Sequence, residues 1–522
     1  MAFVQHYRCG AVVLQSTVNL IQQVIKAADF ISDTLYLPLP LLPNPSSDIA
    51  TNHKDTLLER QTSYIEYLSN LFHDFRQIIP KLDIRVLVPI LPGTCPAPLS
   101  RPIEVIVSSY PDISQTEASP TYRILSERIL SHKYIFLPET TISKTYLFQE
   151  TDIWHVGCHK HAVVGGTFDH LHQGHYLLLA ATALYSSSSC LVGVSSGPLL
   201  KDKVLRELVE PLEQRCIKVK ELLQDMRPGL KLDIVSITDP YGPSITETEL
   251  DCLIVSEETL KAGEAVNRKR LESGMSQLYI HKIPIIAGTN NKLSSTQQRN
   301  NILGIYREQP PTQKRKQKCM PYVIGLTGGT CSGKTSIATY LGSKGAYIIN
   351  CDRLGHESYK SGTPTFHRLV ESFGTSLLDH NGSIDRKSLA NIVFSDADKL
   401  NLLNQIVWPA IADLMQECIT EALREGVKVC VVDAAVMLEA GWEDNVDELW
   451  VAFVPENHGI ERLMQRNGLS EETARDRISS QMNNEEKIAR ANVVICSLWE
   501  QEITNKQVDC AWDSLFERII KL

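Results

Sequence analysis

Two loops carry residue types that could do phosphate chemistry. The first, GGTFDHLHQGH, occupies 165–175, and the second, GGTCSGKT, occupies 328–335. Each loop follows a short β-rich run and opens a helical pattern. Glycines let a backbone approach a ligand closely, and the free N–H groups at a helix start attract anions. The sequence therefore predicts two separate sites for the phosphates of nucleotides.

The first loop pairs two imidazoles with two glycines. His172 and His175 lie three residues apart at a helix start, so one helix face would aim both rings at the same phosphates. Such rings can donate hydrogen bonds to charge that builds on a phosphorus atom. Gly165 and Gly166 would let the backbone close on the ligand. This arrangement is typical of nucleotidyl transfer, in which the substrate itself supplies the nucleophile.

A second segment, SSTQQR at 294–299, ends the same run of strands and helices. Hydroxyl and amide groups at a helix start, followed one turn later by an arginine, suit β- and γ-phosphates. We expect this segment to complete the first site.

The second loop has the Gly-x4-Gly-Lys-Thr spacing between a strand and a helix, which is the context that a P-loop requires. Its backbone N–H groups would wrap the phosphates, Lys334 would bridge the β- and γ-phosphates, and Thr335 would hold Mg²⁺. The predicted ATP-binding residues are Gly328, Gly329, Thr330, Cys331, Ser332, Gly333, Lys334 and Thr335.

Two features after the P-loop indicate a phosphate acceptor. Asp352 ends the strand pattern 348–352 and could accept the proton of an attacking hydroxyl, although a turn or helix-cap aspartate is the alternative. Two charged helices joined by Gly468 resemble a mobile lid that expels water on closing. Their arginines are Arg462, Arg466, Arg475 and Arg477. A solvated charged face is the alternative for these helices.

The order of elements predicts the fold class. Strands alternate with helices from 162 to 303 and again from 322 to 496, which favours α/β architecture with parallel sheets. We expect two consecutive doubly wound domains, a Rossmann-like nucleotidyltransferase and a P-loop kinase. The predicted parts are an N-terminal accessory region 1–155, a nucleotidyltransferase domain 160–305, a linker 306–319 and a kinase domain 320–522. The helices expected in these two domains include 172–185, 205–226, 262–273 and 398–425.

The N-terminal region carries no chemical motif. A helix is expected at 57–79 and strands at 84–91, 103–109 and 134–137, which together indicate an α/β accessory domain. The uncharged run 9–25 is interpreted as an ordinary first helix. A mitochondrial transit or anchoring segment is the alternative, because the first 28 residues contain Arg8 and Lys26 but no acidic residue.

Composition excludes several functions. The net charge of −9 gives no overall basic field, so we expect no nucleic-acid partner. Thirteen cysteines without a C-x-x-C pair indicate free thiols in a reducing, cytoplasmic compartment. No apolar run is long enough to span a bilayer.

His155, His159 and His161 beside Cys158 imitate a metal cluster, but their spacing fits no zinc site. We therefore predict no tightly bound metal or organic cofactor.

The first set of motifs resembles a known family. The block 165–175, together with VSEET at 255–259, Asn267-Arg268 and SSTQQR, is similar to phosphopantetheine adenylyltransferases of the archaeal and eukaryotic form. The resemblance implies that 4′-phosphopantetheine attacks the α-phosphate of ATP, giving dephospho-CoA and pyrophosphate. His172 and His175 would bind ATP and stabilise the transition state, and Thr167 would place the pantetheine phosphate. The other implied phosphate ligands are Ser294, Ser295, Thr296, Arg299, Arg268, and Lys201 or Lys203.

The second set resembles another family. IGLTGGTCSGKTS, NCDRLGH, RLMQRNGLSEETARDRISSQM and ARANVVI are similar to segments of dephospho-CoA kinases. The resemblance implies transfer of the γ-phosphate of ATP to a ribose 3′-hydroxyl, with Asp352 as base. Lys334 and Thr335 would hold phosphate and magnesium, and Arg466 and Arg477 would act from the lid. Trp408, the run 433–439 and 496–498 depart from the family pattern on the acceptor side.

Both sets in this order resemble the bifunctional coenzyme A synthases of animals. That resemblance implies the last two steps of coenzyme A biosynthesis, with ATP and Mg²⁺ as co-substrate and small molecules as partners. Two other interpretations are other substrates, such as nicotinate mononucleotide and nucleosides, and a non-catalytic scaffold that retains nucleotide folds. The N-terminal region would then regulate or localise the enzyme, including at a membrane or mitochondrion. The sequence leaves the oligomeric state open.

Overall fold

The computed structural model describes most of the chain outside the N-terminal region. The described residues are 7–13, 20–38, 62, 65–74, 82–87, 99–108, 113–118, 122, 125, 133–136, 157–286, 294–307, 321–394 and 396–520. The chain divides into two compact units. The first comprises 1–204 and 209–298, and the second comprises 205–208 and 299–522. Of the predicted linker 306–319, only 306 and 307 are among the described residues.

The first unit begins with a sheet of its own. Its five parallel strands have the order β3-β2-β1-β4-β5. The strands are β1 (Tyr7–Val13), β2 (Ile31–Pro38), β3 (Asp83–Leu87), β4 (Val105–Ser108) and β5 (Lys133–Phe136), with helices α1 (Leu20–Ala28) and α3 (Ile113–Ala118). The predicted α/β fold of the N-terminal region is therefore confirmed. Within the predicted helix 57–79, residues 65–74 are helical.

The prediction of an ordinary helix across 9–25 is wrong at its start. Residues 7–13 form the central strand β1, and the helix begins only at Leu20. Cys9, Ala11 and Val12 are all buried. A central strand is covered on both faces, so it shows neither the alternation of a half-exposed strand nor the period of an amphipathic helix.

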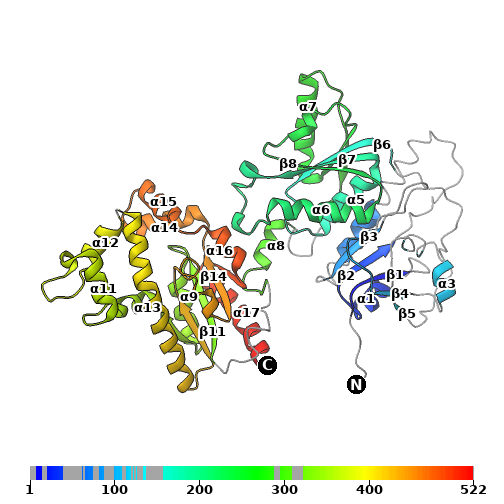
Figure 1. Cartoon of the computed structure of the whole chain (residues 1–522). Coiled ribbons are helices and arrows are strands. Elements are labelled where there is room, and N and C mark those ends of the chain that lie inside the picture. The colour runs from blue at the N-terminus through cyan, green and yellow to red at the C-terminus, as the bar shows by residue number, and fades with distance from the viewer. Residues whose placement is uncertain are drawn as a thin grey trace, which may run out of the picture. The chain divides into compact units, whose positions relative to one another are not determined.

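The second sheet of this unit is also parallel, with the order β10-β9-β6-β7-β8. Helices α5 and α6 pack on one face and α7 packs on the other (Figure 1). The strands are β6 (His159–Gly166), β7 (Ser186–Ser195), β8 (Lys231–Ile237), β9 (Cys252–Ser256) and β10 (Tyr279–Ile283). The helices are α5 (Gln173–Tyr185), α6 (Leu212–Met226), α7 (Leu260–Glu272) and α8 (Ser295–Asn301).

The predicted helix 205–226 is wrong in its first turns. Residues Arg206–Leu208 form one 3₁₀ turn, and α6 starts at Leu212, after Pro211 as its N-cap. Proline disfavours helical backbone in the residue before it, so a single helix cannot continue through position 211.

A buried polar network joins the two sheets of the first unit. Asp225 at the end of α6 is 1% exposed and accepts hydrogen bonds from Tyr36, Arg85 and Ser100 of the N-terminal region, at 3.0, 2.6 and 2.8 Å. Tyr176 of α5 donates its hydroxyl to Asp83 of β3 at 2.6 Å. One apolar core runs through both sheets. The N-terminal region is thus part of the same compact unit as the first loop.

The second unit is a third parallel sheet, with the order β12-β13-β11-β14-β15. Helices α9 and α17 pack on one face, and α10 and α13 on the other. Its strands are β11 (Tyr322–Gly328), β12 (Tyr347–Asn350), β13 (Val429–Asp433), β14 (Glu448–Phe453) and β15 (Val493–Cys496). Its helices are α9 (Lys334–Ser343), α10 (Cys351–Ser358), α11 (Pro364–Phe373), α12 (Arg386–Phe394), α13 (Ala397–Arg424), α14 (Glu456–Asn467), α15 (Glu471–Ser479), α16 (Asn484–Arg490) and α17 (Gln501–Ile520).

Three parallel sheets confirm the predicted α/β class. Among the described residues, no helix is long and apolar enough to cross a membrane. Association of the N-terminus with a membrane or mitochondrion stays a prediction, and so do the domain boundaries.

Candidate active sites

The P-loop follows directly from the last residue of β11 and leads into α9. Cys331 and Gly333 have φ of 64° and 80°, the left-handed region that a loop needs to curl back on itself. A Cβ at Gly328 would overlap the carbonyl oxygen of Ala452 on β14. Only glycine fits there, because the central strand passes its neighbour so closely. The loop backbone is therefore fixed by the sheet that carries it.

A cavity of about 710 Å³ surrounds this loop. It is lined by the whole predicted phosphate segment 328–335, by Asp352 from α10 and by Arg462 and Arg466 from α14. Segments distant in sequence thus supply a phosphate loop, a carboxylate and two guanidinium groups to one space. Arg477 of α15 is not among the described residues that line the cavity, and its role in the lid stays a prediction.

Lys334 forms an ion pair with Asp433, the last residue of β13. The carboxylate is 2% exposed and also accepts from the amide of Asn350 at 3.2 Å. Sequence reasoning gave Asp433 no role. A carboxylate that ends a fully buried strand beside a P-loop is the position of a magnesium-holding aspartate in P-loop enzymes, and that signal could have found it.

Asp352 lies in the first turn of α10, and its side chain is exposed towards the cavity. The N-cap of this helix is Asn350, whose side chain accepts from Arg353 N at 2.9 Å. A capping role for Asp352 is thereby excluded. Its carboxylate remains available for a substrate hydroxyl.

The two charged helices α14 and α15 pack through Ile460, Leu463 and Ala474. They are joined at Gly468, which ends α14 at φ 64°. Arg462 reaches the P-loop, where it donates to Cys331 O at 3.2 Å and to Ser497 Oγ at 2.9 Å. Arg466 donates to its neighbour Asn467 at 2.8 Å and is exposed. The helix pair therefore contacts the phosphate loop as a lid would.

Gln481, just after α15, is a contact that sequence reasoning missed. Its carbonyl accepts from Thr330 N at 2.9 Å, and its amide donates to Thr330 Oγ1 at 2.9 Å. The segment after the lid is thus tied to the tip of the P-loop by two hydrogen bonds. No local motif marks a glutamine for such a role.

The first loop leaves β6 at Gly166 with a strained backbone. Phe168 and His170 adopt φ of 49° and 45°, which non-glycine residues rarely do. Such strain persists only where surrounding contacts impose it. Buried Asp169 accepts from Glu210 N at 2.8 Å, while Glu210 Oε2 accepts from His170 N at 3.0 Å. These reciprocal hydrogen bonds fix the conformation of the loop.

Arg215 of α6 is a second residue that the sequence did not reveal. It is 1% exposed, and its guanidinium donates to Thr167 O at 2.6 Å, Ser195 O at 2.9 Å and Glu210 O at 2.8 Å. Burial lowers the pKa of this guanidinium from its ordinary value. Arg215 thus fixes the loop backbone at Thr167, the predicted ligand of the acceptor phosphate.

His172 and His175 stack, with ring centroids 3.9 Å apart and an interplanar angle of 24°. A Cβ at Gly174 would lie 3.1 Å from the His172 ring, so the glycine makes room for it. Burial, and then the neighbouring His172, hold the pKa of His175 well below its usual value of 6.5. His175 is therefore neutral at physiological pH. His172 is the N-cap residue of α5, so both rings sit where the helix N–H groups are unpaired.

The other predicted ligands of the first site lie on other segments of the chain. Lys201 and Lys203 lie in an exposed turn, and Arg268 is exposed on α7. Ser294, Ser295 and Thr296 begin α8, where Ser294 Oγ accepts from Gln297 N at 3.3 Å. Arg299 falls in the second unit and is 1% exposed. The binding roles of these residues, and the choice between the two lysines, stay predictions.

The two sites define the chain as a nucleotide-handling enzyme with a P-loop kinase unit and a Rossmann-like sheet. Comparison with known proteins narrows the class of protein to which each of these two parts is similar. The family model described as dephospho-CoA kinase matches residues 322–498, and the model described as cytidylyltransferase-like matches residues 163–301.

Two relatives, from Geobacter and Carboxydothermus, agree with the first match. The chain is 40% identical to a dephospho-CoA kinase from Geobacter sulfurreducens over 194 residues, covering 37% of this chain and 98% of the relative. It is 38% identical to one from Carboxydothermus hydrogenoformans, covering 36% and 90%. A solved dephospho-CoA kinase from Campylobacter jejuni is 24% identical, covering 38% and 98%, with a TM-score of 0.31. The chain belongs to the dephospho-CoA kinase family, and it carries a cytidylyltransferase-like domain before the kinase domain, consistent with a coenzyme A synthase fusion.

Proposed function

We propose that this chain catalyses the last two steps of coenzyme A biosynthesis. The first unit would transfer the adenylyl group of ATP to 4′-phosphopantetheine, releasing pyrophosphate and forming dephospho-CoA. The second would transfer the γ-phosphate of another ATP to the ribose 3′-hydroxyl of that product, giving CoA and ADP. Membership of the dephospho-CoA kinase family supports the second step, and the cytidylyltransferase-like domain supports a nucleotidyl transfer before it.

The observation that carries the proposal is the cavity shared by the P-loop, Asp352, Arg462 and Arg466. Phosphoryl transfer needs little covalent chemistry from the protein and depends on positioning and on charge stabilisation. On binding of Mg-ATP, Lys334 would exchange Asp433 for the β- and γ-phosphates. The released carboxylate and the Thr335 hydroxyl would then face the magnesium ion that accompanies the nucleotide. Asp352 would accept the hydroxyl proton as the acceptor attacks.

The adenylyl transfer would use a different kind of stabilisation. The phosphate of phosphopantetheine attacks the α-phosphorus, and the bond to the bridging oxygen of pyrophosphate breaks. Neutral His175 can donate one hydrogen bond to the charge that develops there, together with the free N–H groups at the start of α5. Arg215 would act as a positioning residue, because it holds the carbonyl of Thr167.

Mass spectrometry of the products made from phosphopantetheine and Mg-ATP tests both steps at once. We expect dephospho-CoA and CoA, with one pyrophosphate released for each adenylyl transfer and one ADP released for each CoA formed. Nicotinate mononucleotide as acceptor serves as the matched control, and we expect no dinucleotide from it. Formation of the dinucleotide without dephospho-CoA would assign the first unit to another substrate, whereas absence of both by-products would favour a non-catalytic scaffold.

A further inference from the structure

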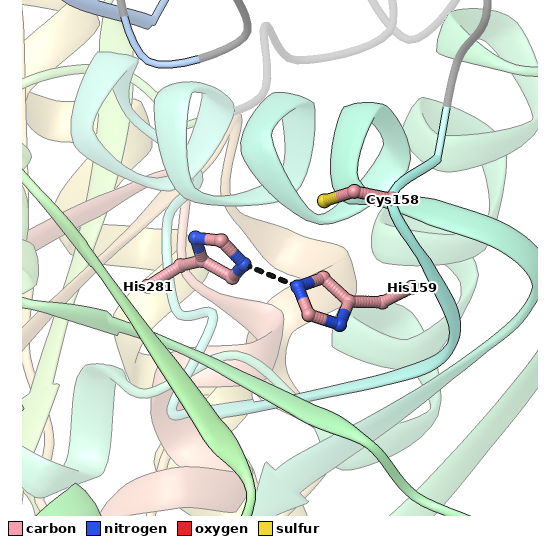
Figure 2. A group of neighbouring side chains, drawn as sticks. All are labelled: Cys158, His159 and His281. Atoms are coloured by element: carbon pink, nitrogen blue, oxygen red, sulfur yellow. Dashed lines mark hydrogen bonds between the residues drawn. The ribbon is translucent and has the colours of Figure 1, made fainter. Parts of the chain in front are cut away.

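A cluster of three metal-ligating side chains lies in the first unit, away from the loop of the predicted site. Cys158 and His159 stand at the start of β6, and His281 stands on β10, with β9 between the two strands. One ligand atom from each residue lies within 4.8 Å of the other two. Figure 2 shows the two imidazoles facing each other through their nitrogens, with the sulfur of Cys158 beside them. Three side chains from two strands thus converge on one point.

The cluster is independent of the phosphate chemistry. His159 begins β6, whereas the strained loop follows Gly166 at the other end of the same strand. Seven residues of extended strand separate these ends by roughly 23 Å. Ligands of open parallel sheets bind at the carboxyl ends of the strands. The cluster lies at the amino end, and the proposed adenylyl transfer leaves it without a role.

The two histidines are held in an unusual contact. Their Nε2 atoms are 2.8 Å apart, and the rings are 8% and 6% exposed. The Tyr185 ring stacks on His281 with centroids 3.9 Å apart, which fixes its orientation. Two ring nitrogens at hydrogen-bond distance cannot both carry hydrogen, so at least one of them presents a lone pair, which is what a metal ion binds.

The carboxylate of Asp251 lies close to one member of this pair, His159. A carboxylate oxygen of Asp251 lies within 4.8 Å of a nitrogen of His159. Both oxygens of Asp251 accept backbone hydrogen bonds, from Lys160 N at 2.8 Å and His161 N at 2.9 Å. The position of the carboxylate is thus fixed by the strand. Metal-ligating histidines commonly have such a carboxylate in their outer shell, where it orients the ring and raises its basicity.

We propose that Cys158, His159 and His281 bind one Zn²⁺ ion, with a water molecule as the fourth ligand. Zinc takes sulfur at about 2.3 Å and imidazole nitrogen at about 2.0–2.1 Å in tetrahedral geometry, which places two imidazole nitrogens about 3.3 Å apart. The 2.8 Å contact would therefore open by about 0.5 Å. Binding releases the thiol proton of Cys158, and the ring that carries hydrogen on Nε2 takes its Nδ1–H tautomer.

The ion would cross-link β6 and β10, which are separated in the sheet by β9. A ligand that binds only the folded state stabilises it by mass action. The expected effect is structural, because the site lies at the end of the sheet opposite the strained loop. Sequence spacing alone could not find this site, since His281 is 122 residues from His159. His161, which the sequence grouped with the cluster, instead contacts Ser189 Oγ at 2.7 Å, and His155 lies outside the described residues.

Metal analysis of the full chain tests the site. The purified protein would be stripped with a chelator, dialysed against Zn²⁺ and assayed by plasma mass spectrometry. We expect one retained Zn²⁺ per chain in the wild type and in His161→Gln, the matched control on the same strand. His281→Gln should lose binding by more than the roughly 10- to 100-fold that loss of an outer-shell partner costs. Equal retention by His281→Gln and the wild type would overturn the proposal.

Cobalt loading gives a second readout that does not depend on enzyme activity. A thiolate–Co²⁺ charge-transfer band should appear in the wild type and in Cys216→Ser, whose thiol is half-buried like that of Cys158. The band should be absent in Cys158→Ser. This variant keeps both imidazoles, so it remains informative if His281→Gln fails to fold. A stripped wild type that takes up neither ion, or a band that survives in Cys158→Ser, would show that the cluster is only a hydrogen-bonded pair of histidines.

Discussion

In the second unit the loop lysine already has a counter-ion, whereas in the first unit the two loop histidines stack ring on ring. In the P-loop site, two cationic side chains already have partners. Lys334 is paired with the buried carboxylate of Asp433, and Arg462 donates hydrogen bonds to Cys331 and Ser497. The other loop carries a histidine whose pKa is held far below 6.5, so its donor is neutral. The two predicted phosphate sites thus differ in their electrostatics: one uses a paired cation, and the other uses a neutral hydrogen-bond donor.

This difference has a physical consequence for binding. The P-loop must exchange one ion pair for another when ATP enters, so part of its electrostatic energy is already present without the nucleotide. In the first loop, the His175 ring is neutral instead. Its contribution grows as charge develops in the transition state, which is where a donor accelerates a reaction. Three of the following four predictions test whether the two loops act separately and in these ways, and one tests how the N-terminal sheet of the first unit is attached.

The largest effect is expected from Lys334→Ala. Loss of the loop cation should lower the kinase rate on the order of 10³, the upper end for removal of one preorganised donor. Adenylyl transfer should continue, so dephospho-CoA accumulates. Chromatography of the products measures both. Lys344→Ala, on the turn after the same helix and paired with Asp509 at 2.7 Å, is the control. Unchanged CoA output from Lys334→Ala would contradict the P-loop assignment.

His175→Ala should produce the converse result. The rate of pyrophosphate release should fall on the order of 10²–10³, while phosphorylation of added dephospho-CoA is unaffected. A coupled pyrophosphate assay and a coupled ADP assay on one preparation separate the two. His161→Gln, on the preceding strand, should change neither. If both activities fell together in His175→Ala, the loops would not be independent.

Asp225→Asn examines the attachment of the first unit's N-terminal sheet, for which the described part of the second unit shows no equivalent. The amide would remove the negative charge beside buried Arg85, which keeps Asp83 at 3.0 Å and the neutral Ser100 Oγ at 2.7 Å. Breaking a buried ion pair costs about 3 kcal/mol at the lower end. Local opening, followed as proteolytic cleavage within 1–155, should accelerate on the order of 100-fold. The exposed Asp233→Asn is the control, and equal cleavage of both variants would refute this role of the network.

The smallest effect concerns pH. The folded pKa of His175 lies below the value of about 6.5 in the unfolded chain, so below that pH the unfolded state binds a proton that the folded state refuses. Stability should be constant above about pH 6.5 and fall below it, by at most about 1.4 kcal/mol per pH unit. Denaturant-dependent hydrogen exchange of α5 at pH 7 and 5.5 measures this, with α9 of the second unit as reference. His175→Gln should flatten the dependence, and an unchanged slope would argue against a neutral buried ring.

Elements with clear end signals were predictable from sequence. The helix predicted at 398–425 is α13, which spans Ala397–Arg424, because the Asp396 side chain caps its start and Gly426 follows its end at φ 74°. Helix α14 ends at Asn467 as predicted, before Gly468. Helices α10, α16 and α17 were missed, and strands β1 and β2 were missed or misread. Strand β2 contains Asp33 and ends at Pro38. These two residues are uncommon in strands, so its buried residues did not stand out as a strand pattern.

The motif residues were predictable, but the residues that support them were not. The phosphate loop, Asp352, Arg462 and Arg466 share one cavity, as the kinase interpretation requires. Arg215, by contrast, looks in sequence like a solvated helical charge, yet its whole side chain is buried against carbonyl groups. Asp433 and Gln481 lie 99 and 151 residues from their partners in the P-loop. Such pairings depend on how strands are ordered in the sheet, which local patterns do not encode.

The position of β1 in the middle of its sheet limits how this chain can be shortened. β1 pairs with β2 on one side and with β4 on the other. A truncated chain that starts after Val13 would have this sheet separated into two fragments, each with a newly unpaired row of backbone groups. Unpaired strand edges promote aggregation. Because one apolar core and the hydrogen bonds of Asp225 also join this sheet to the next one, a shortened chain should keep β1 whole.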